Sequence, residues 1–596
     1  MKEDSTVPNC LLAKVKGTQI EVNRSELHIQ TVANPPFRGM DVQRARVRVV
    51  SQLWTAVLST SLALLVGAKV HADQGYTFNK VVLSGETAAG IAGGLTFDGF
   101  GFPLIDSAGR VAFRGYVSGP GVDSSNNEGL WHGEANSLDL IVREGFDAPL
   151  VESGTRLRLI GPVYYLGSDG TVAFNGAMEG PDMPSTGAIG MWGWNSNNVR
   201  IVARTGTLAP GLDEGERFRS IGTAKFSVAS DGGVSFWSAL GNAAGVPYFD
   251  HDSVWTERGG SPELLAREGD AVPEVSPSAT VSGLTFIGSS KTGTPTRVFH
   301  GSMKGGILGG GFDYGLWVES NSSMSLVAYT GMPAPGFQDG RLLGNILTSA
   351  FAVNSSGQTA FTGFAGDPNG AQNSFMVYAG SQDALRFIAQ DGDQAPGTLP
   401  GVRFDAMYSN NLQSLPISES GRTAFKTSLI GPGVNLFTNS RAVYSEGFGT
   451  LDLVARAGNQ APGAPDGALF DRFNTIDMLA SGQLIFGASL RGTGVTTENS
   501  NGIWVQNPMG ELLKLVRQGD VIEVGSGDFR TVAFFNFAFG QSVNELGDIA
   551  IEMRFADNTS GVFVTRVPEP ASALLIAAAS LVYRRRRWRG SSADRI

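Results

Sequence analysis

The residues best suited to acid–base or metal chemistry in the main part of the chain are three histidines, His132, His251 and His300. No two of them stand at the three- or four-residue spacing with which paired imidazoles bind zinc. The single cysteine, Cys10, lies far upstream, which excludes disulfides, thiol catalysis and cysteine-ligated zinc from residues 73–567. We therefore expect the histidines to be loop residues or surface residues with satisfied partners.

Five arginines stand just before recurring glycines, a position that could place a ring of cations around a channel and capture anions. The alternative is that each guanidinium pairs with local acids or carbonyls and stabilises its own part of the fold. We favour local pairing, because the arginine accompanies a structural turn. The five are Arg143, Arg204, Arg267, Arg456 and Arg517.

Three variable stretches, 118–128, 179–186 and 366–373, are rich in Asn, Asp, Ser, Gly and Pro. Their oxygens could bind glycan hydroxyls or calcium, yet none contains an Asp-x-Asp-x-Asp-Gly calcium loop. Solvated turns explain the same composition. We expect no cofactor, with calcium as a weak alternative.

The elements that must position these residues repeat along the chain. A hydrophobic strand runs into a glycine turn eight times, and the interval between successive glycines is 60 to 66 residues. Independent loops do not keep such a period, so the repeat unit is about 62 residues long. The glycines are Gly85, Gly145, Gly206, Gly269, Gly331, Gly392, Gly458 and Gly519.

A second motif reads polar-x-x-Gly-x-x-Ala-Phe, as in residues 106–113 and 354–361. Its glycine is expected to adopt a positive φ in a turn that starts the next strand. These structural turn glycines are Gly109, Gly170, Gly232, Gly357, Gly421, Gly482 and Gly547.

An aromatic series forms the third motif and lies 14 residues before the next turn glycine in six of seven cases. This spacing is typical of a tight hairpin, and we expect the rings to pack between units rather than to form a sugar-binding platform. The series is Trp131, Trp192, Trp255, Trp317, Tyr378, Tyr444, Trp504 and Phe563.

Each unit thus offers about four short strands without helical periodicity, which predicts an all-β fold. A β-propeller of about eight four-stranded blades fits best, with tandem small β-sandwich repeats as the alternative. The propeller is expected over residues 73–567. Its units lie near 80–140, 141–200, 201–263, 264–325, 326–386, 387–452, 453–513 and 514–566.

The N-terminal region has the three parts of an export signal. Arginines at positions 44, 46 and 48 precede an apolar stretch at 53–67, and a small-residue site favours cleavage between Ala72 and Asp73. We read residues 40–72 as a signal peptide and residues 1–39 as an upstream extension, with Met40 as the expected true start. A short transmembrane anchor is the alternative.

The C-terminal segment, 567–596, combines three features in a fixed order. Val567, Pro568, Glu569 and Pro570 precede an apolar run at 571–583, which is followed by Arg584, Arg585, Arg586 and Arg587. A short apolar run with a basic end stops in the membrane. The alternative to a processed signal is an ordinary tail anchor.

This C-terminal order closely resembles the PEP-CTERM sorting signal of Gram-negative bacteria. The resemblance implies recognition by an exosortase-type membrane protease, a transient membrane anchor, and a final location at the cell surface or in the extracellular polysaccharide matrix. The repeats at residues 80–566 resemble those of choice-of-anchor surface proteins with the N-x-x-G-x-x-A-F motif. That second resemblance implies location and architecture, but no activity.

Charge narrows the possible partners. Residues 73–567 hold 48 acidic and 30 basic residues, and this negative surface repels nucleic acid. We expect an exported, non-enzymatic binding or structural module whose partners are the export machinery, the sorting protease and extracellular polysaccharide. The alternative is a secreted glycan hydrolase or lyase, which needs paired carboxylates. The irregular fourth unit, with 291–296 inserted, gains no acid pair, and this favours the non-enzymatic reading.

Overall fold

The computed structural model describes residues 11–15, 18–22, 76–181, 188–196, 198–212, 215–242, 251–305, 313–347, 352–366, 374–405, 415–538 and 540–567. The chain divides into two compact units, Met1–Gln74 and Gly75–Ile596. In the first, β1 (Leu11–Val15) and β2 (Thr18–Val22) form an antiparallel hairpin. The described residues contain no helix that is long and apolar enough to span a membrane.

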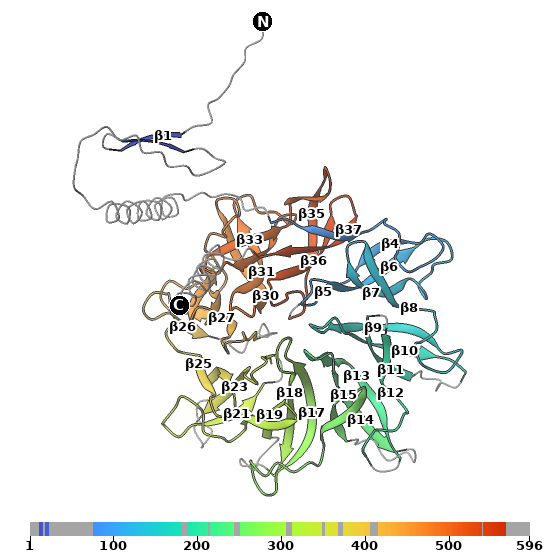
Figure 1. Ribbon diagram of the computed structural model, residues 1–596. Helices are drawn as coiled ribbons and strands as arrows, with labels where there is room; N and C mark the ends of the chain where they lie inside the picture. Colours follow the sequence, from blue (N-terminus) through green and yellow to red (C-terminus); the bar gives the residue numbers. More distant parts are fainter. Residues whose placement is uncertain are drawn as a thin grey trace, which may run out of the picture. The chain divides into compact units, whose positions relative to one another are not determined.

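The second unit is an eight-bladed β-propeller, which confirms the predicted fold class (Figure 1). Blade 1 contains β4 (Thr96–Phe100), β5 (Leu104–Ile105), β6 (Val111–Ser118), β7 (Glu128–Glu134) and β8 (Ser137–Arg143). Blade 2 contains β9 (Arg156–Leu166), β10 (Val172–Glu179), β11 (Ala188–Asn195) and β12 (Asn198–Arg204). Blade 3 contains β13 (Glu216–Val228), β14 (Val234–Asn242), β15 (Asp252–Arg258) and β16 (Ser261–Arg267). Blade 4 contains β17 (Thr280–Ser289), β18 (Thr296–Lys304), β19 (Asp313–Ser320) and β20 (Ser323–Tyr329).

The other four blades follow the same antiparallel order. Blade 5 contains β21 (Leu342–Ile346), β22 (Ala352–Val353), β23 (Thr359–Gly366), β24 (Ser374–Gly380) and β25 (Arg386–Gln390). Blade 6 contains β26 (Arg403–Asp405), β27 (Ala424–Ile430), β28 (Arg441–Ser445) and β29 (Asp452–Arg456). Blade 7 contains β30 (Ala468–Met478), β31 (Leu484–Gly492), β32 (Asn501–Gln506) and β33 (Leu512–Arg517). Blade 8 contains β34 (Val521–Gly525), β35 (Asp528–Asn536), β36 (Asp548–Phe555), β37 (Ser560–Arg566) and β3 (Asn79–Leu83).

The ring is closed by a strand from far away in the sequence. β3 pairs with β37 and supplies the outer strand of blade 8. In the other seven blades the outer strand, such as β8 or β12, directly follows the third strand of the same blade along the chain. The repeat units read from the sequence therefore begin one strand earlier than the blades, because each glycine turn follows the last strand of a blade.

The aromatic series packs between blades, as predicted. Phe113 pairs with Trp131 across β6 and β7, and their rings stack at 6.2 Å with an interplanar angle of 11°. The corresponding pairs of blades 2 to 7 also stack, with centroid distances of 5.4 to 6.5 Å. Both rings alternate toward one face of their sheet, where the neighbouring blade covers them.

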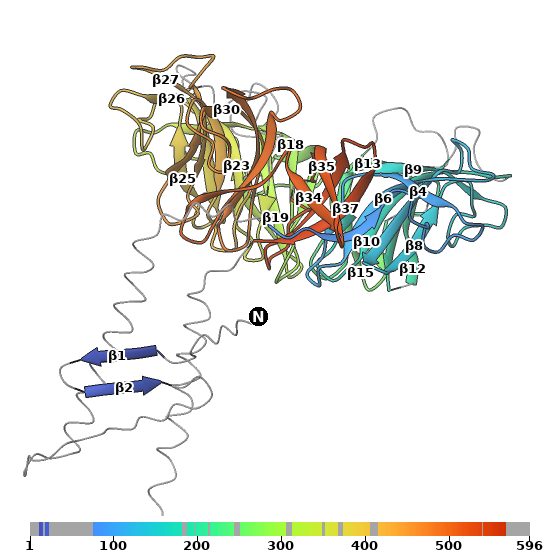
Figure 2. The same ribbon diagram turned by 90° about the horizontal axis from the view of Figure 1, so that it is seen from above.

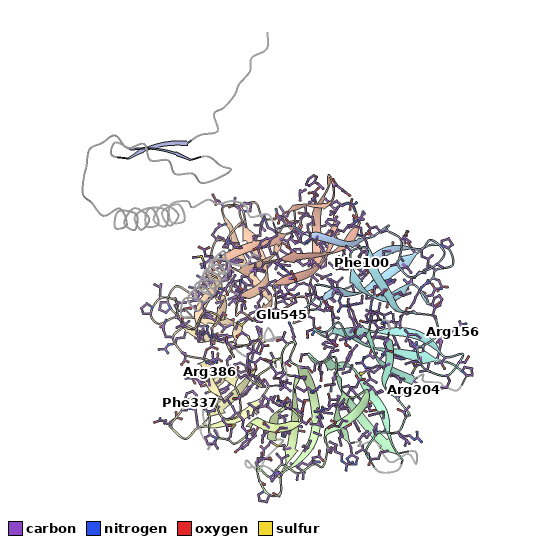
Figure 3. The ribbon with its side chains drawn as sticks, viewed as in Figure 1. Phe100, Arg156, Arg204, Phe337, Arg386 and Glu545 are labelled. Carbon is purple, nitrogen blue, oxygen red and sulfur yellow. The ribbon has the colours of Figure 1, made fainter. Side chains whose placement is uncertain are left out.

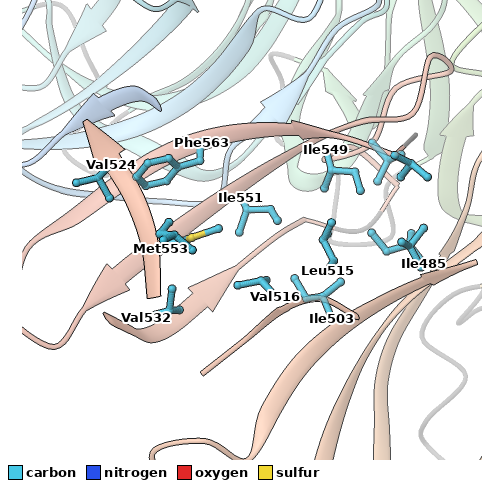
Figure 4. Close-up of a cluster of buried hydrophobic side chains, with 14 of the residues drawn as sticks. Ile485, Ile503, Leu515, Val516, Val524, Val532, Ile549, Ile551, Met553 and Phe563 are labelled. Atoms are coloured by element: carbon cyan, nitrogen blue, oxygen red, sulfur yellow. The ribbon is translucent and has the colours of Figure 1, made fainter. Parts of the chain in front are cut away.

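Eight hydrophobic clusters fill the eight junctions between neighbouring blades. Figure 4 shows the cluster in which Ile503 and Leu515 of blade 7 face Ile549 and Phe563 of blade 8. Burial of one such side chain stabilises the fold by about 1.5–3 kcal/mol. The core of each blade is thus completed only by its neighbour.

Two faces of the ring differ in their connections. One face, here the turn face, carries the polar-x-x-Gly turns and the hairpins between the third and fourth strands of each blade. The opposite face, here the loop face, carries the variable loops between the second and third strands and the glycine turns that lead to the next blade. Figure 2 shows the sheets around the ring from a second direction.

The polar-x-x-Gly turns contact one another around the ring axis. All seven predicted turn glycines have positive φ, from 74° at Gly357 to 94° at Gly482. Asn544 donates from Nδ2 to the Asp106 carbonyl at 3.0 Å, which joins blade 8 to blade 1. Asn354 donates to the Ser418 carbonyl at 3.0 Å and joins blade 5 to blade 6. At Asn354 and Asn544 the polar first residue of the motif therefore connects blades, in addition to forming its own turn.

The insertion of the fourth unit crosses the turn-face end of the axis. Lys291 Nζ lies 3.9 Å from Asp477 Oδ2 of blade 7, and the Thr292 hydroxyl donates to Glu419 Oε1 of blade 6 at 2.8 Å. From blade 8, the Gly540 amide donates to Asp477 Oδ2 at 2.9 Å. Segments of blades 4 and 8 thus meet near the centre, where Lys291 and Gly540 line a small open hollow together with Gln541 and Asn544.

Candidate binding face

Three variable loops on the loop face share one backbone frame. They lie in blades 1, 6 and 7 at 119–127, 431–440 and 492–500, and each contains Gly-x-Gly-Val followed by an Asn four or five residues later. The Asn is Asn126, Asn439 or Asn499. Its Oδ1 accepts the amide hydrogen of the residue after the Val, at 3.1, 2.6 and 2.8 Å respectively. Its Nδ2 donates to the carbonyl of the second Gly, at 3.2, 3.0 and 3.1 Å.

An arginine from the fourth strand of the same blade forms a hydrogen bond to each frame. Nε of Arg143, Arg456 and Arg517 donates to the backbone carbonyl of the frame Asn at 2.8, 2.8 and 2.7 Å. The frame Val is half-buried and packs on the inter-blade core. Each loop is therefore attached to its blade at three points, through Val, Asn and Arg.

The tips that this frame presents differ in chemistry. Blade 1 exposes Ser124 and Ser125, blade 6 exposes Leu436 and Phe437, and blade 7 exposes Thr497 and Glu498. The frame Val and Asn are half-buried in all three loops, whereas the tip residues are exposed. A constant support with variable exposed tips is the usual arrangement of a binding surface built on loops.

The remaining arginines of the predicted set also pair locally. Arg204 Nη1 lies 2.6 Å from Glu152 Oε2, and Arg267 lies 3.7 Å from Glu216 and 3.9 Å from Asp270. They lie on the outer strands β12 and β16. Figure 3 shows Arg204 toward the periphery and Glu545 near the centre of the ring. Local pairing is confirmed, and the five arginines do not line the axis.

The histidines differ from the expectation at two positions. His251 is exposed in a loop, as predicted, whereas His132 and His300 are buried in β7 and β18. His132 Nε2 lies 3.5 Å from Asp106 Oδ2. Burial lowers the pKa of His300 to about 4, and its Nδ1 lies 3.0 Å from the Thr285 hydroxyl. The surface prediction was wrong for these two because each lies on a second or third strand and faces the side that the adjacent blade covers, beside Leu130 in blade 1 and Val298 in blade 4.

One acid pair lies between blades 1 and 2. Arg114 Nη1 lies 3.2 Å from Glu128 Oε2, and Glu144 Oε1 accepts the Ile160 amide hydrogen at 2.9 Å. Burial, and next the charge of Glu128, raise the pKa of Glu144. Thr205 occupies the position of Glu144 in blade 2 and accepts the Ile189 amide hydrogen at 3.0 Å. In both blades the side chain of the residue before the turn glycine thus accepts a hydrogen bond from a backbone amide. The Glu144 carboxylate is engaged in this structural contact.

No metal centre emerges in the part of the chain that the structure describes, where no three His, Cys, Asp or Glu residues converge. Of the predicted processing residues, Val567 is described. It is buried, and its amide donates to the Gly547 carbonyl at 3.0 Å. Ala72, Asp73, Pro568, Glu569, Pro570 and Arg584 to Arg587 lie outside the described residues.

A family model described as "Family of unknown function (DUF7453)" matches residues 65–298 and 223–574. The chain belongs to this family. A search of curated proteins found no match for this DUF7453 member. The two matched stretches together cover the whole propeller.

Solved structures similar to the DUF7453 member are distant in sequence. One is the β-propeller domain of the Trilobed protease from Pyrococcus furiosus (8% identity, TM-score 0.32), with 71% of this chain and 99% of that chain covered. Another is the Dos1 propeller (10% identity, TM-score 0.36), with 83% and 96% covered. A third is an ulvan lyase of a polysaccharide lyase family (10% identity, TM-score 0.28), with 73% and 94% covered.

Sequence reasoning missed the frame of the three loops. It recognised the arginines and the polar loops separately, but did not connect them. The signal that could have found the frame is the joint recurrence of Gly-x-Gly-Val, an Asn, and an Arg 17 or 18 residues after that Asn, as in Asn126 and Arg143. In this DUF7453 member the arginines and the loop asparagines are parts of the same hydrogen-bonded loop structure.

Proposed function

We propose that this DUF7453 protein is an exported, non-enzymatic binding module of the cell surface or extracellular matrix, and that its loop face binds extracellular polysaccharide. The observation that carries the proposal is the loop frame, which holds chemically different tips in the same way in blades 1, 6 and 7. Rigid loops lose little conformational freedom on binding, so more of the contact energy is available as affinity.

The polar tips of blades 1 and 7 suit a ligand rich in hydroxyl groups. The exposed Ser125 hydroxyl lies 2.6 Å from Asp123 Oδ1, and the Thr497 hydroxyl donates to Glu498 Oε1 at 2.8 Å. These hydroxyls keep acceptor capacity, while the carboxylates accept hydrogen bonds from sugar hydroxyls. A neutral glycan also avoids repulsion by the acidic surface.

The exit points of the chain support an outward-facing loop face. Val567 contacts Gly547 of the blade 8 turn, and β3 begins at the same turn face because its partner β37 ends there. The proposed sorting segment begins at Val567. In a protein held by such a tail the turn face would lie toward the membrane. The three loops would then point away from it.

A secreted glycan hydrolase or lyase is the second candidate, and the pair of Glu128 and Glu144 beside Arg114 is the observation in its favour. Against it stands the geometry of Glu144, which is buried and accepts the Ile160 amide hydrogen. A general acid must reach its substrate. We therefore place the proposed function at the loops.

Calorimetry on the full chain tests the proposal and separates the candidates. Matrix polysaccharide of the producing bacterium is titrated into wild-type protein and into a variant with Ser124→Ala, Ser125→Ala and Thr497→Ala, which retains every frame Asn. We expect the wild-type protein to give heats that saturate. The affinity of the variant for the polysaccharide should be at least fivefold lower. The matched control, Ser381→Ala in a turn-face hairpin, should bind like the wild type.

Two outcomes would overturn the binding proposal. Heat flow that continues after each injection, and that stops in a Glu144→Gln variant, would mean turnover at the acid pair. If the wild-type protein gives no heat, with or without calcium, the loop face does not bind this polysaccharide. The protein would then have a purely structural role at the surface.

A further inference from the structure

One glycine turn on the loop face departs from the pattern of the other repeats. In four repeats the residue after the turn glycine is an acid that accepts the amide hydrogen of the residue three positions before it, at 2.7 to 3.2 Å. These acids are Glu86, Asp270, Asp393 and Asp520. Between blades 1 and 2 this position holds Phe146, whose side chain is 51% exposed. Its ring lies against the Arg143 guanidinium, with 4.8 Å from Cζ to the ring centroid.

A second departure follows four residues later in the same loop. Five repeats have a glycine there, and all five have a positive φ, between 71° and 88°: Gly90, Gly211, Gly336, Gly397 and Gly463. Leu150 takes this position between blades 1 and 2 and keeps the same left-handed conformation, with a φ of 58°. Leucine rarely adopts it, because its Cβ crowds the backbone. Since the Leu150 side chain is 66% exposed, burial does not offset the strain, which points to a role in binding.

Polar groups of the blade 1 loop adjoin this turn. The turn packs directly on the loop, since a side chain begun at Gly145 would meet the Ser125 carbonyl at 2.9 Å. Arg143, on which the exposed ring lies, also donates to the Asn126 carbonyl at 2.8 Å. The Ser125 amide and hydroxyl both donate to Oδ1 of Asp123, at 2.8 and 2.6 Å, so a ligand hydroxyl can donate to Oδ2. An aromatic ring and a carboxylate are thus presented side by side.

The backbone that carries the two exposed apolar side chains is fixed. The Leu157 amide donates to the Phe146 carbonyl at 2.8 Å, and Trp192 Nε1 donates to the Pro149 carbonyl at 2.9 Å. Trp192 is itself buried in blade 2. Phe146 and Leu150 therefore belong to a loop that is anchored on both sides, and a ligand has little of it to order on binding.

We propose that the Phe146 ring, together with Asp123 and Ser125, forms a subsite for one neutral hexopyranose residue of the polysaccharide. This subsite rests on the proposed function and names the sugar unit that blade 1 binds. A pyranose has a face of C–H bonds, which an aromatic ring attracts, and hydroxyl groups around its edge. Because Arg143 covers one face of the Phe146 ring, the sugar stacks on the other. Its edge hydroxyls bind the adjoining loop, and Leu150 adds apolar surface.

Two other ligands fit these residues less well. Asp147, which follows Phe146, and Asp123 are both exposed. Hydrogen bonds from the Ser125 hydroxyl, and next from its amide, lower the pKa of Asp123. Asp123 is therefore charged at neutral pH and repels a uronic acid. An apolar protein surface laid over the ring would take the same carboxylate out of water without a partner.

Substitutions that restore the pattern of the other repeats test the subsite in the full chain. Phe146→Asp returns the carboxylate, and Leu150→Gly returns the glycine. Both variants should unfold at the wild-type temperature or above it, because each regains the residue that suits the turn. The ligands are neutral oligosaccharides, released from the matrix polysaccharide by partial acid hydrolysis and separated by anion exchange. Calorimetry should show at least tenfold weaker binding for Phe146→Asp and at least threefold weaker binding for Leu150→Gly.

Two further variants and a second readout separate stacking from other effects. Phe146→Tyr keeps the ring and should bind within threefold of the wild type. Phe448→Asp is the matched control, since Phe448 is 46% exposed in a turn-face hairpin, and it should bind like the wild type. In saturation-transfer difference NMR, the protons on one C–H face of the sugar should receive the most transfer. Phe146→Asp should abolish that preference.

Four results would overturn the subsite. If Phe146→Asp binds like the wild type while the Ser124, Ser125 and Thr497 variant loses affinity, the subsite falls and the proposed function stands. Equal transfer to both faces of the sugar would refute stacking. Binding confined to the acidic oligosaccharides would refute a neutral sugar. A wild-type protein that binds neither the polysaccharide nor its fragments would refute the proposed function, and the subsite with it.

Discussion

Replacing Asn439 by Ala should loosen the blade 6 loop without unfolding the blade. The substitution removes two side-chain hydrogen bonds, from the Asn435 amide at 2.6 Å and to the Gly433 carbonyl at 3.0 Å. It leaves the backbone carbonyl that accepts from Arg456 at 2.8 Å. Asn439 is thus a position at which the frame can be weakened separately from its support by Arg456.

The expected magnitude follows from these two bonds. Each contributes about 0.5–1.5 kcal/mol net, and the exposed setting of the loop favours the lower half of their sum, about 1–2 kcal/mol. The local opening equilibrium should rise by a factor of about 5–30. Hydrogen–deuterium exchange at the Asn435 amide measures this change directly, because that amide loses its acceptor.

Two comparisons make the exchange measurement decisive. Phe437→Ser changes the tip but keeps both frame bonds, so exchange at Asn435 should stay at the wild-type rate. Asn126→Ala should accelerate exchange at Asp123 in blade 1, because it removes the same contacts there. Exchange at Asn435 within twofold of wild type in Asn439→Ala would refute the reasoning that the Asn side chain holds the loop.

Four further predictions concern the ring and the ends of the chain. Trp192→Ala should cost about 3–5 kcal/mol in denaturant unfolding, since Trp192 is buried, stacks on Phe174 and donates from Nε1 to the Pro149 carbonyl; a loss below 1 kcal/mol would contradict its role between blades. Burial lowers the pKa of His300 in the folded state to about 4 from 6.5, so the unfolded chain binds the proton more readily, and stability should fall by up to about 3 kcal/mol as pH drops from 7 to 4. His300→Gln should lack that part of the pH dependence, and equal slopes for the two proteins would refute it. Replacing Arg584 to Arg587 by Gln should block processing of the tail, visible as retention of a C-terminal epitope in blots of the producing bacterium; normal removal would count against the proposed sorting signal. Removal of residues 1–84 should leave blade 8 without its outer strand and shift unfolding to a lower denaturant concentration, whereas removal of residues 1–39 should not.

The periodic part of the fold was predictable because its physical causes are local. The glycine of each polar-x-x-Gly turn needs a positive φ, so Gly109 predicted a turn. A strand that points a large aromatic side chain to one face needs a neighbour to cover it, so Trp131 predicted a contact between blades. The pattern of eight such units was sufficient for a propeller of eight blades. The closure of blade 8 by β3 was not predicted, since the partner of an edge strand leaves no mark in the strand itself.

The candidate site was predictable only in part. The arginines were correctly expected to pair locally. The link between Asn439 and Arg456 was missed because a carbonyl acceptor has no sequence signature. The burial of His132 and His300 was missed because it depends on the adjacent blade, which the spacing within one unit does not reveal.

The pairing of β3 with β37 also determines when the molecule can become complete. Val82 and Val562 are partners about 480 residues apart, so the first strand of the propeller waits for the last blade. Long-range pairing of this kind is slow, and an unpaired strand edge attracts other chains in the meantime. For a chain that crosses a membrane with its N-terminus first, the closing strand arrives outside before any blade does. Most blades can form one after another, but the ring closes only once β37 is available to pair with β3. A β3 that pairs with blade 8 of another molecule would join two rings by exchange.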